Sequence, residues 1–134
     1  MSECLFCKFV QGEKQPHRVW EDDDYLAFLD INPIKPGHTL LVPKRHDRYL
    51  FEVDEPGYCG LLLTAKWLSR PLCQATSAER VGMIVEGFEV PHIHIHLVPL
   101  HNRNELTPEK GRPAPVEALR AMAAKLAEAI EEYA

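Results

Sequence analysis

Three histidines alternate with aliphatic residues in the stretch PHIHIHLVP, which covers residues 91–99. On a β-strand, alternate side chains share a face, so His92, His94 and His96 are predicted to point one way and the aliphatic residues into the core. Neighbouring histidines on a straight strand would lie roughly 6.5 Å apart, close enough for two of them, but hardly for all three, to bind one metal ion. The row therefore predicts a chemical site built on a strand.

Three interpretations of this row are open. A purely structural row would leave several imidazole nitrogens in need of hydrogen-bond partners. A metal site would use an H-x-H pair on a strand as two ligands. Phosphate chemistry would use one neutral imidazole to attack phosphorus while its neighbours orient it and hold the phosphoryl oxygens. The strict alternation favours one of the two functional interpretations.

A second set of candidate ligands lies near the start of the chain, where Cys4 and Cys7 form a C-x-x-C motif. A thioredoxin-like redox role needs a βαβ context that the sequence lacks, and two unrelated thiols are also a reasonable interpretation. Cys59 and Cys73 fall in one long helical pattern, roughly 20 Å apart, so they could not bridge each other. We interpret both as small core residues.

The elements that must position these residues follow from hydrophobic periodicity and turn residues. Asp54 and Pro56 predict the start of a helix, which Pro71 should kink or end. A closing amphipathic helix is predicted from Val116, where apolar residues keep helical spacing. Strands are predicted over residues 18–21, 25–29, 38–42, 81–86 and 90–99.

This order of elements predicts an α+β fold, a five-stranded antiparallel sheet with a middle helix and a C-terminal helix. We expect a single domain over residues 1–134, because no repeat or long linker divides the chain. Residues 101–134 are expected to form a loop and the closing helix.

Bulk composition argues against several classes of protein. The net charge is −5, with 20 acidic residues against 15 Lys plus Arg, which argues against a nucleic-acid partner. No apolar run is long enough to span a membrane, and 46% hydrophobic with 26% charged residues is typical of soluble globular proteins. The first residues lack the pattern of a secretory signal, so we expect a cytoplasmic protein.

Taken together, the motifs resemble the histidine triad (HIT) family of nucleotide hydrolases and transferases. Residues 92–98 follow the family signature His-φ-His-φ-His-φ-φ, in which φ is hydrophobic, and the upstream stretches CLFCKFVQGE and EDDDYLAFLDINPIKPGHTLLVPKRH are also similar to the family. The resemblance covers residues 1–100. It implies a HIT-like fold, a homodimer, a nucleotide as small-molecule substrate, and no organic cofactor.

The resemblance also implies roles for four histidines. His94 is similar to the nucleophile that forms a nucleotidyl-histidine intermediate at the α-phosphate. His96 resembles the residue that contacts the phosphate and helps to protonate the leaving group. His92 resembles the one that braces the row, and His38 resembles the histidine that supports the nucleophile from a neighbouring strand.

The nucleoside would be bound, by the same resemblance, through its ribose and its base. Asp30 resembles the ribose ligand, although the same carboxylate could simply cap the turn into residues 32–33. Phe6, Phe28 and Ile31 resemble the apolar walls around the base.

A subset of bacterial family members binds a structural zinc ion through two cysteines and two histidines. In this chain the resemblance assigns those ligands to Cys4, Cys7, His46 and His92. Two thiolates and two imidazoles form a closed tetrahedral set, which is typical of a structural ion. Such an ion would hold the N-terminus against the sheet and orient His92.

The chain departs from the family where many members contact phosphate. Val85 stands at the usual Asn position, and the usual Gln has no counterpart. Glu89 near the site would repel an anion. A nucleoside phosphoramidate, a dinucleoside polyphosphate and an adenylylated amine therefore remain open as substrates. Two other functions remain open as well, a non-catalytic nucleotide-binding protein and a metal-dependent hydrolase that uses His94 and His96 as ligands.

Overall fold

The computed structural model describes residues 4–134. Residues 1–3, part of the segment in which no secretory signal was expected, lie outside the described residues. The helices of the described chain are α1 (Leu5–Gln11), η1 (Leu50–Glu52), α2 (Glu55–Thr76), η2 (Pro108–Lys110) and α3 (Val116–Tyr133), where η marks a short 3-10 helix. The strands are β1 (Arg18–Glu21), β2 (Tyr25–Leu29), β3 (Thr39–Pro43), β4 (Arg80–Ile84) and β5 (Ile95–Leu100).

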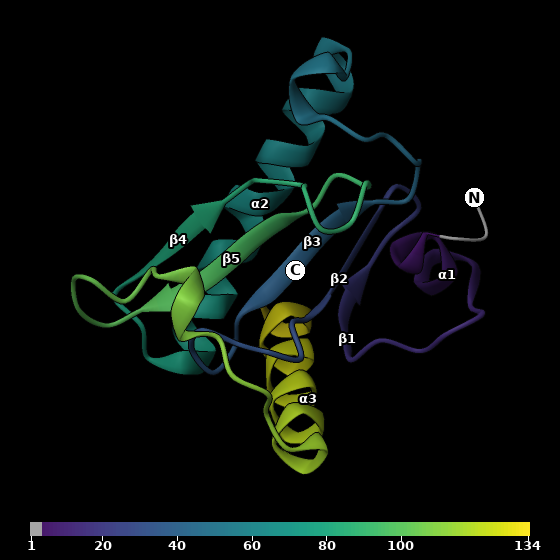
Figure 1. Cartoon of the computed structure of the whole chain (residues 1–134). Coiled ribbons are helices and arrows are strands. Elements are labelled where there is room, and N and C mark those ends of the chain that lie inside the picture. The colour runs from purple at the N-terminus through teal and green to yellow at the C-terminus, as the bar shows by residue number, and fades with distance from the viewer. Residues whose placement is uncertain (1–3) are drawn as a thin grey trace.

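The five strands form one antiparallel sheet in the order β1-β2-β3-β5-β4 (Figure 1). The predicted α+β fold, with a middle and a C-terminal helix on a five-stranded sheet, is confirmed. β5 lies between β3 and β4, so Leu40 on β3 stands opposite His96 on β5. This register brings the segment that contains His38 next to the histidine row.

The two faces of the sheet bury different side chains. Leu41 and Ile95 belong to a core covered by α2 and α3, which pack against each other and against the same face. Phe28 and Leu40 belong to a smaller core on the other face, together with Phe6 of α1. In Figure 1, α1 accordingly lies near β1 and β2, apart from the two long helices. Strand alternation places His96 on the face that carries this smaller core.

Helix α2 begins as the sequence predicts, with the Asp54 carboxylate accepting a hydrogen bond from the backbone N–H of Gly57 at 3.0 Å. Pro71 was expected to kink or end this helix. The expected end is wrong, because α2 continues through Pro71 to residue 76. A proline inside a helix costs about 3 kcal/mol. Burial of Pro71 and Leu72 against the sheet offsets that cost.

The strand expected over residues 90–99 is shorter than predicted, since β5 begins at Ile95. Pro91 has no backbone N–H, and the N–H of Ile93 donates to the carbonyl oxygen of Asp47 at 2.8 Å, outside the sheet. The first two histidines therefore lie on an irregular segment that leads into β5. The other strand ends differ from the expected ones by no more than two residues.

Helix α1, which contains Cys7, was not predicted. The Cys4 side chain caps it by accepting from the backbone N–H of Cys7 at 3.4 Å, and Gly12 ends it with a left-handed φ of 81°. Cysteine is not among the usual N-cap residues, so the start of this helix carries little sequence signal.

The interpretation of Cys59 and Cys73 as core residues is wrong. Cys59 is exposed and Cys73 is half-buried, and neither belongs to the buried residues of α2. No helix among residues 4–134 combines the length and the apolar character that crossing a membrane requires.

Candidate active site and metal-ligand cluster

A cavity of about 570 Å³ opens on the face of the sheet that carries the smaller core. Its lining combines residues from α1, β2, the loop before β3, the segment after β4 and the start of β5. Of the residues that the sequence singles out for catalysis or substrate binding, it contains Phe6, Phe28, Asp30, Ile31, His38, His94 and His96. His92 is fully buried and is not part of the lining.

His94 is held with one ring nitrogen bonded to the protein. Its Nδ1 atom lies 2.8 Å from the backbone carbonyl oxygen of His92. A carbonyl oxygen only accepts hydrogen bonds, so in the neutral ring Nδ1 carries the proton and Nε2 keeps its lone pair. The edge of the Phe6 ring packs on the imidazole, with 5.1 Å between ring centroids. The arrangement leaves an unprotonated nitrogen available to the cavity.

His38 and His96 form a second hydrogen-bonded chain. The backbone N–H of Ile34 donates to Nδ1 of His38 at 3.0 Å, so the proton of a neutral His38 is on Nε2. That Nε2 lies 2.9 Å from Nδ1 of His96 and donates to it. The proton of a neutral His96 is therefore on Nε2, the nitrogen that His38 does not occupy.

Burial keeps these imidazoles neutral near pH 7. It lowers the pKa of His38 to about 4, although the Asp30 carboxylate acts in the opposite direction. Burial also lowers the pKa of His96 below its ordinary value, with a smaller contribution from His94. The hydrogen-bond directions given above for His38 and His96 are those of the neutral rings, so they apply at physiological pH.

Both interpretations of Asp30 find a counterpart in its two carboxylate oxygens. Oδ1 accepts from the backbone N–H of Asn32 at 2.8 Å, which is the expected turn cap. Oδ2 lies 3.6 Å from His38 Nε2 and 3.9 Å from His96 Nδ1, beside the cavity. The cap therefore uses one oxygen and leaves the other facing the site.

Cys4, Cys7, His46 and His92 converge on one point, with ligand atoms within 4.8 Å of one another. The shortest separations join His46 Nδ1 to Cys7 Sγ and to His92 Nδ1, both 3.2 Å, and His92 Nδ1 lies 3.5 Å from Cys4 Sγ. In a tetrahedral site with two sulfur and two nitrogen ligands, such as a zinc site, neighbouring ligand atoms lie about 3.3–3.8 Å apart. These residues can hold a metal ion.

The orientation of the His92 ring fits this use. Its Nε2 atom donates to the backbone carbonyl oxygen of Pro43 at 2.8 Å, so Nδ1 keeps a lone pair directed at the cysteines. Burial raises the pKa of the Cys7 thiol, with further increases from Cys4. Without a cation nearby, the Cys7 thiol would therefore stay protonated.

A second group of possible metal ligands contains Asp30, His38 and His96. The 2.9 Å between the facing nitrogens of His38 and His96 is the length of a hydrogen bond, and a proton already occupies that line. Neither of these two groups, the only ones of three or more among residues 4–134, contains His94. The suggested pairing of His94 with His96 as metal ligands therefore gains no support from the geometry.

Sequence reasoning missed several residues of the cavity. Phe9 of α1 lines the cavity and packs its ring on Phe28 with centroids 5.0 Å apart. Helix α1 is too short for its hydrophobic periodicity to predict which residues face the cavity. Glu86 lines the cavity together with Glu89, from the segment after β4. Pro108 of the loop after β5 forms another part of the wall.

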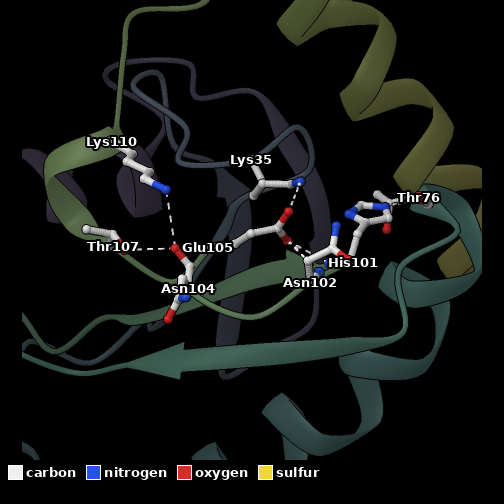
Figure 2. A network of polar contacts seen from close by, with 8 residues as sticks. All are labelled: Lys35, Thr76, His101, Asn102, Asn104, Glu105, Thr107 and Lys110. Atoms are coloured by element: carbon white, nitrogen blue, oxygen red, sulfur yellow. Dashed lines mark hydrogen bonds and ion pairs between the residues drawn. The ribbon is translucent and has the colours of Figure 1, made fainter.

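The segment after β5 is fixed by a polar network around Glu105 (Figure 2). One carboxylate oxygen accepts from the backbone N–H groups of His101 and Asn102 at 2.7 and 3.1 Å, and the other accepts from Lys35 at 3.0 Å. These hydrogen bonds lower the pKa of Glu105 to about 2. Lys35 belongs to the loop that precedes His38, so the network joins two walls of the cavity.

Close backbone packing continues this junction. A Cβ atom on Gly111 would lie 2.7 Å from the carbonyl oxygen of Asn32, so only glycine fits without a shift of the chain. The backbone N–H of Ala114 donates to the carbonyl oxygen of Ile31 at 3.1 Å. The chain after β5 thereby holds the loop that contains Ile31 and Asn32.

Comparison with known proteins gives a consistent result. A family model described as HIT domain matches residues 11–103. An uncharacterized HIT-like protein of Borreliella burgdorferi is 38% identical over 74% of this chain and 76% of its own length. An adenylylsulfatase of Arabidopsis thaliana is 31% identical over 77% of this chain and 55% of its own length.

Solved structures agree with the sequence relatives. A HIT-like protein involved in cell-cycle regulation from Bartonella henselae has a TM-score of 0.85 and 30% identity, over 96% of this chain and 97% of its own. A Zn-bound histidine triad family protein from Mycobacterium smegmatis also has a TM-score of 0.85, with 27% identity over 98% and 95% of the two chains. The chain belongs to the histidine triad (HIT) family, and it has the N-terminal cysteine pair that the sequence analysis singled out.

Proposed function

We propose that the protein is a histidine triad nucleotide hydrolase, or nucleotidyltransferase, that acts at the α-phosphate of a nucleoside phosphoramidate or a dinucleoside polyphosphate. The observation that carries this proposal is the state of His94. Its Nδ1 proton is fixed by the His92 carbonyl oxygen, so its Nε2 lone pair is free beside a cavity of nucleotide size, about 570 Å³.

The proposed reaction has two displacements. Nε2 of His94 forms a bond to the α-phosphorus, and the bond from phosphorus to the leaving group breaks with its electron pair on the leaving atom. That atom takes the proton from Nε2 of His96, and the negative charge left on the His96 ring is balanced by the positive charge of the His94 ring, which then carries phosphorus on Nε2 and a proton on Nδ1. Water then attacks the phosphorus, the bond to His94 breaks, and His96 receives the proton of the water. The products are the nucleoside monophosphate and the protonated leaving group.

The neighbouring residues would position these groups. His38 donates to His96 Nδ1 and so keeps the His96 proton on Nε2, where the leaving group needs it. The free Oδ2 oxygen of Asp30 would accept from the ribose hydroxyls. Phe6, Phe28 and Ile31, all in the cavity lining, would enclose the base.

We further propose that the metal-ligand cluster binds a zinc ion. The donor set of two thiolates and two imidazoles, its tetrahedral spacing and the Zn-bound relative from Mycobacterium smegmatis support this choice. When bound, the ion would tie α1 to His92 and would have no role in the displacement. A reducing compartment such as the cytoplasm would keep Cys4 and Cys7 available as ligands.

A homodimer is the proposed assembly. Strand β4 forms one edge of the sheet, and Met83 on it is 51% exposed. An exposed edge with an apolar side chain favours pairing with another chain. Light scattering on the eluting protein would test this, and a monomeric mass at micromolar concentration would contradict it.

The proposed activity is tested by AMP release from an adenosine phosphoramidate and from a diadenosine polyphosphate. Wild type should release AMP, and His94→Ala should lose at least about a thousandfold in kcat while unfolding at the same temperature. Equal rates in the two proteins would contradict the mechanism. Nucleotide binding without turnover in wild type would favour the non-catalytic alternative.

A further inference from the structure

The charge of the cavity does not suit a polyphosphate. Its lining contains the carboxylates of Asp30, Glu86 and Glu89, and no lysine or arginine among the residues that the structure describes. Sites for polyphosphates ordinarily supply cationic side chains or metal ions to balance the anionic oxygens. The neutral imidazoles of His38 and His96 do not replace them, since burial lowers the pKa of both.

Glu86 and Glu89 lie on the segment between β4 and the histidine row. Both are exposed, and neither forms an ion pair with any residue in the described part of the chain. Both carboxylates act electrostatically on His96, where they oppose the dominant effect of burial. Their charges therefore reach the ring that would protonate the leaving group, and they remain uncompensated.

The same cavity contains a group that awaits a ligand. His94 is 7% exposed, its Nδ1 is bonded to the His92 carbonyl oxygen, and its Nε2 has no hydrogen-bond partner among the described residues. An adenylate placed against Nε2 would have its leaving group near His96, within the field of Glu86 and Glu89. The carboxylates thus act on the leaving group. The leaving group is also the part in which the candidate substrates differ, because the nucleotide is common to all of them.

We propose that Glu86 and Glu89 are specificity-determining residues that favour a leaving amine carrying a second, positively charged ammonium group. The inference rests on the proposed function. The substrate is then a nucleoside phosphoramidate of a diamine or of an amine with a cationic side chain. In the reaction the P–N bond breaks, its electron pair stays on nitrogen, and the proton from His96 completes the free amine while the distal ammonium stays near the carboxylates.

The test uses three adenosine phosphoramidates that share one P–N bond and one alkyl chain length. The chain ends in an ammonium, a methyl or a carboxylate group, so the three leaving nitrogens have similar reactivity and only the distal charge differs. Wild type should hydrolyse the ammonium compound with a kcat/KM about tenfold higher than that of the carboxylate compound at low salt. Raising the ionic strength should reduce this ratio, because the carboxylates are exposed.

Two double variants separate the local charges from net charge. Glu86→Gln/Glu89→Gln should bring the ratio close to one. Glu128→Gln/Glu132→Gln removes two exposed carboxylates of α3 that are absent from the cavity lining, and should keep the wild-type ratio. An unchanged ratio in the first variant, or equal rates for the three compounds in wild type, would overturn the inference.

Binding to His94→Ala makes the test independent of turnover. This variant should bind the three compounds in the order ammonium, methyl, carboxylate. If wild type hydrolyses none of them while the binding order holds, the proposed reaction fails and the charge selection stands. If hydrolysis proceeds without a charge order in rate or in binding, the proposed reaction stands and the role of the two glutamates is refuted.

Discussion

Nδ1 of His94 donates a hydrogen bond of 2.8 Å to the backbone carbonyl oxygen of His92, and the ring of His92 belongs to the metal-ligand cluster. His92 therefore accepts the Nδ1 proton of the proposed nucleophile through its main chain and supplies one member of the metal-ligand cluster through its side chain. The segment before β5 is irregular, so its conformation depends on these side-chain interactions more than on the sheet. We expect loss of the cluster to affect both folding stability and the proposed reaction.

Replacing Cys7 should remove the metal. The purified wild-type chain should contain about one equivalent of zinc by elemental analysis, and Cys7→Ser should contain little. Loss of a structural ion would lower the unfolding temperature, by about 10 °C for each 3 kcal/mol of lost stability. Cys59→Ser is the matched control, because Cys59 is an exposed free cysteine on α2. Wild type without metal, or equal unfolding temperatures for all three proteins, would argue against a metal site.

The His38 ring should be needed as a hydrogen-bond donor more than as a base. His38→Ala leaves Nδ1 of His96 without its donor, and kcat for AMP release should fall about a hundredfold. His38→Gln keeps a side-chain N–H and should recover most of that loss. Steady-state kinetics at pH 7 would measure both. Identical losses in the two variants would show that His38 acts in some other way.

Stability should fall between about pH 6.5 and pH 4. The folded-state pKa of His38 is about 4 and its ordinary value is 6.5, so in this interval the unfolded chain binds more protons than the folded one. The free energy of unfolding therefore rises with pH through this window, and His38 contributes about 3 kcal/mol that is present above pH 6.5 and lost by pH 4. The lowered pKa of His96 adds in the same direction.

Urea unfolding at several pH values would measure this dependence. His38→Gln should show a shallower dependence than wild type, by the share of His38. The comparison between the two proteins cancels acid-induced loss of metal, since both retain the metal-ligand cluster. Parallel curves for the two proteins would mean that His38 is not the group that titrates.

The Glu105 network should set the affinity for substrate. Glu105→Ala removes an acceptor for two backbone N–H groups as well as the partner of Lys35, so KM should rise about fivefold to tenfold while kcat changes less than about twofold. Lys35→Met removes the ion pair alone and should have a smaller effect. Glu109→Ala, in the same segment, serves as the control, because its side chain forms no hydrogen bond or ion pair with the described residues. A fall in kcat in Glu105→Ala would indicate that the network supports the histidines instead.

Much of the sheet was accessible from sequence because its signals are local. β1 and β2 match their predicted bounds, and the alternation around Ile95 correctly placed His96 and the aliphatic residues on opposite faces. The start of β5 was not accessible. It depends on a hydrogen bond from Ile93 to Asp47, which joins residues distant in sequence and has no local pattern.

The residues of the candidate site likewise fall into those that a local motif predicts and those that depend on contacts between distant segments. Residues within a recognisable motif, such as His94 or His38, could be named from the sequence. Glu105 could not, since its importance comes from meeting Lys35 across the fold. Pro71 and Cys59 show the opposite error, where a local rule gave an expectation that burial and helix orientation overrode.

Helix α1 has a consequence for how the family's common part can be used. The match to the family model begins at residue 11, whereas Cys4, Cys7 and Phe6 precede it, and α3 lies beyond its end at residue 103. A chain trimmed to the shared range would lose two of the four residues of the metal-ligand cluster, both aromatic side chains that α1 adds to the cavity, and the contacts of α3 with β1 and β2. The part of the chain that builds the site is therefore longer than the family match. Grafting the histidine row into another scaffold would require α1 and α3 to be included.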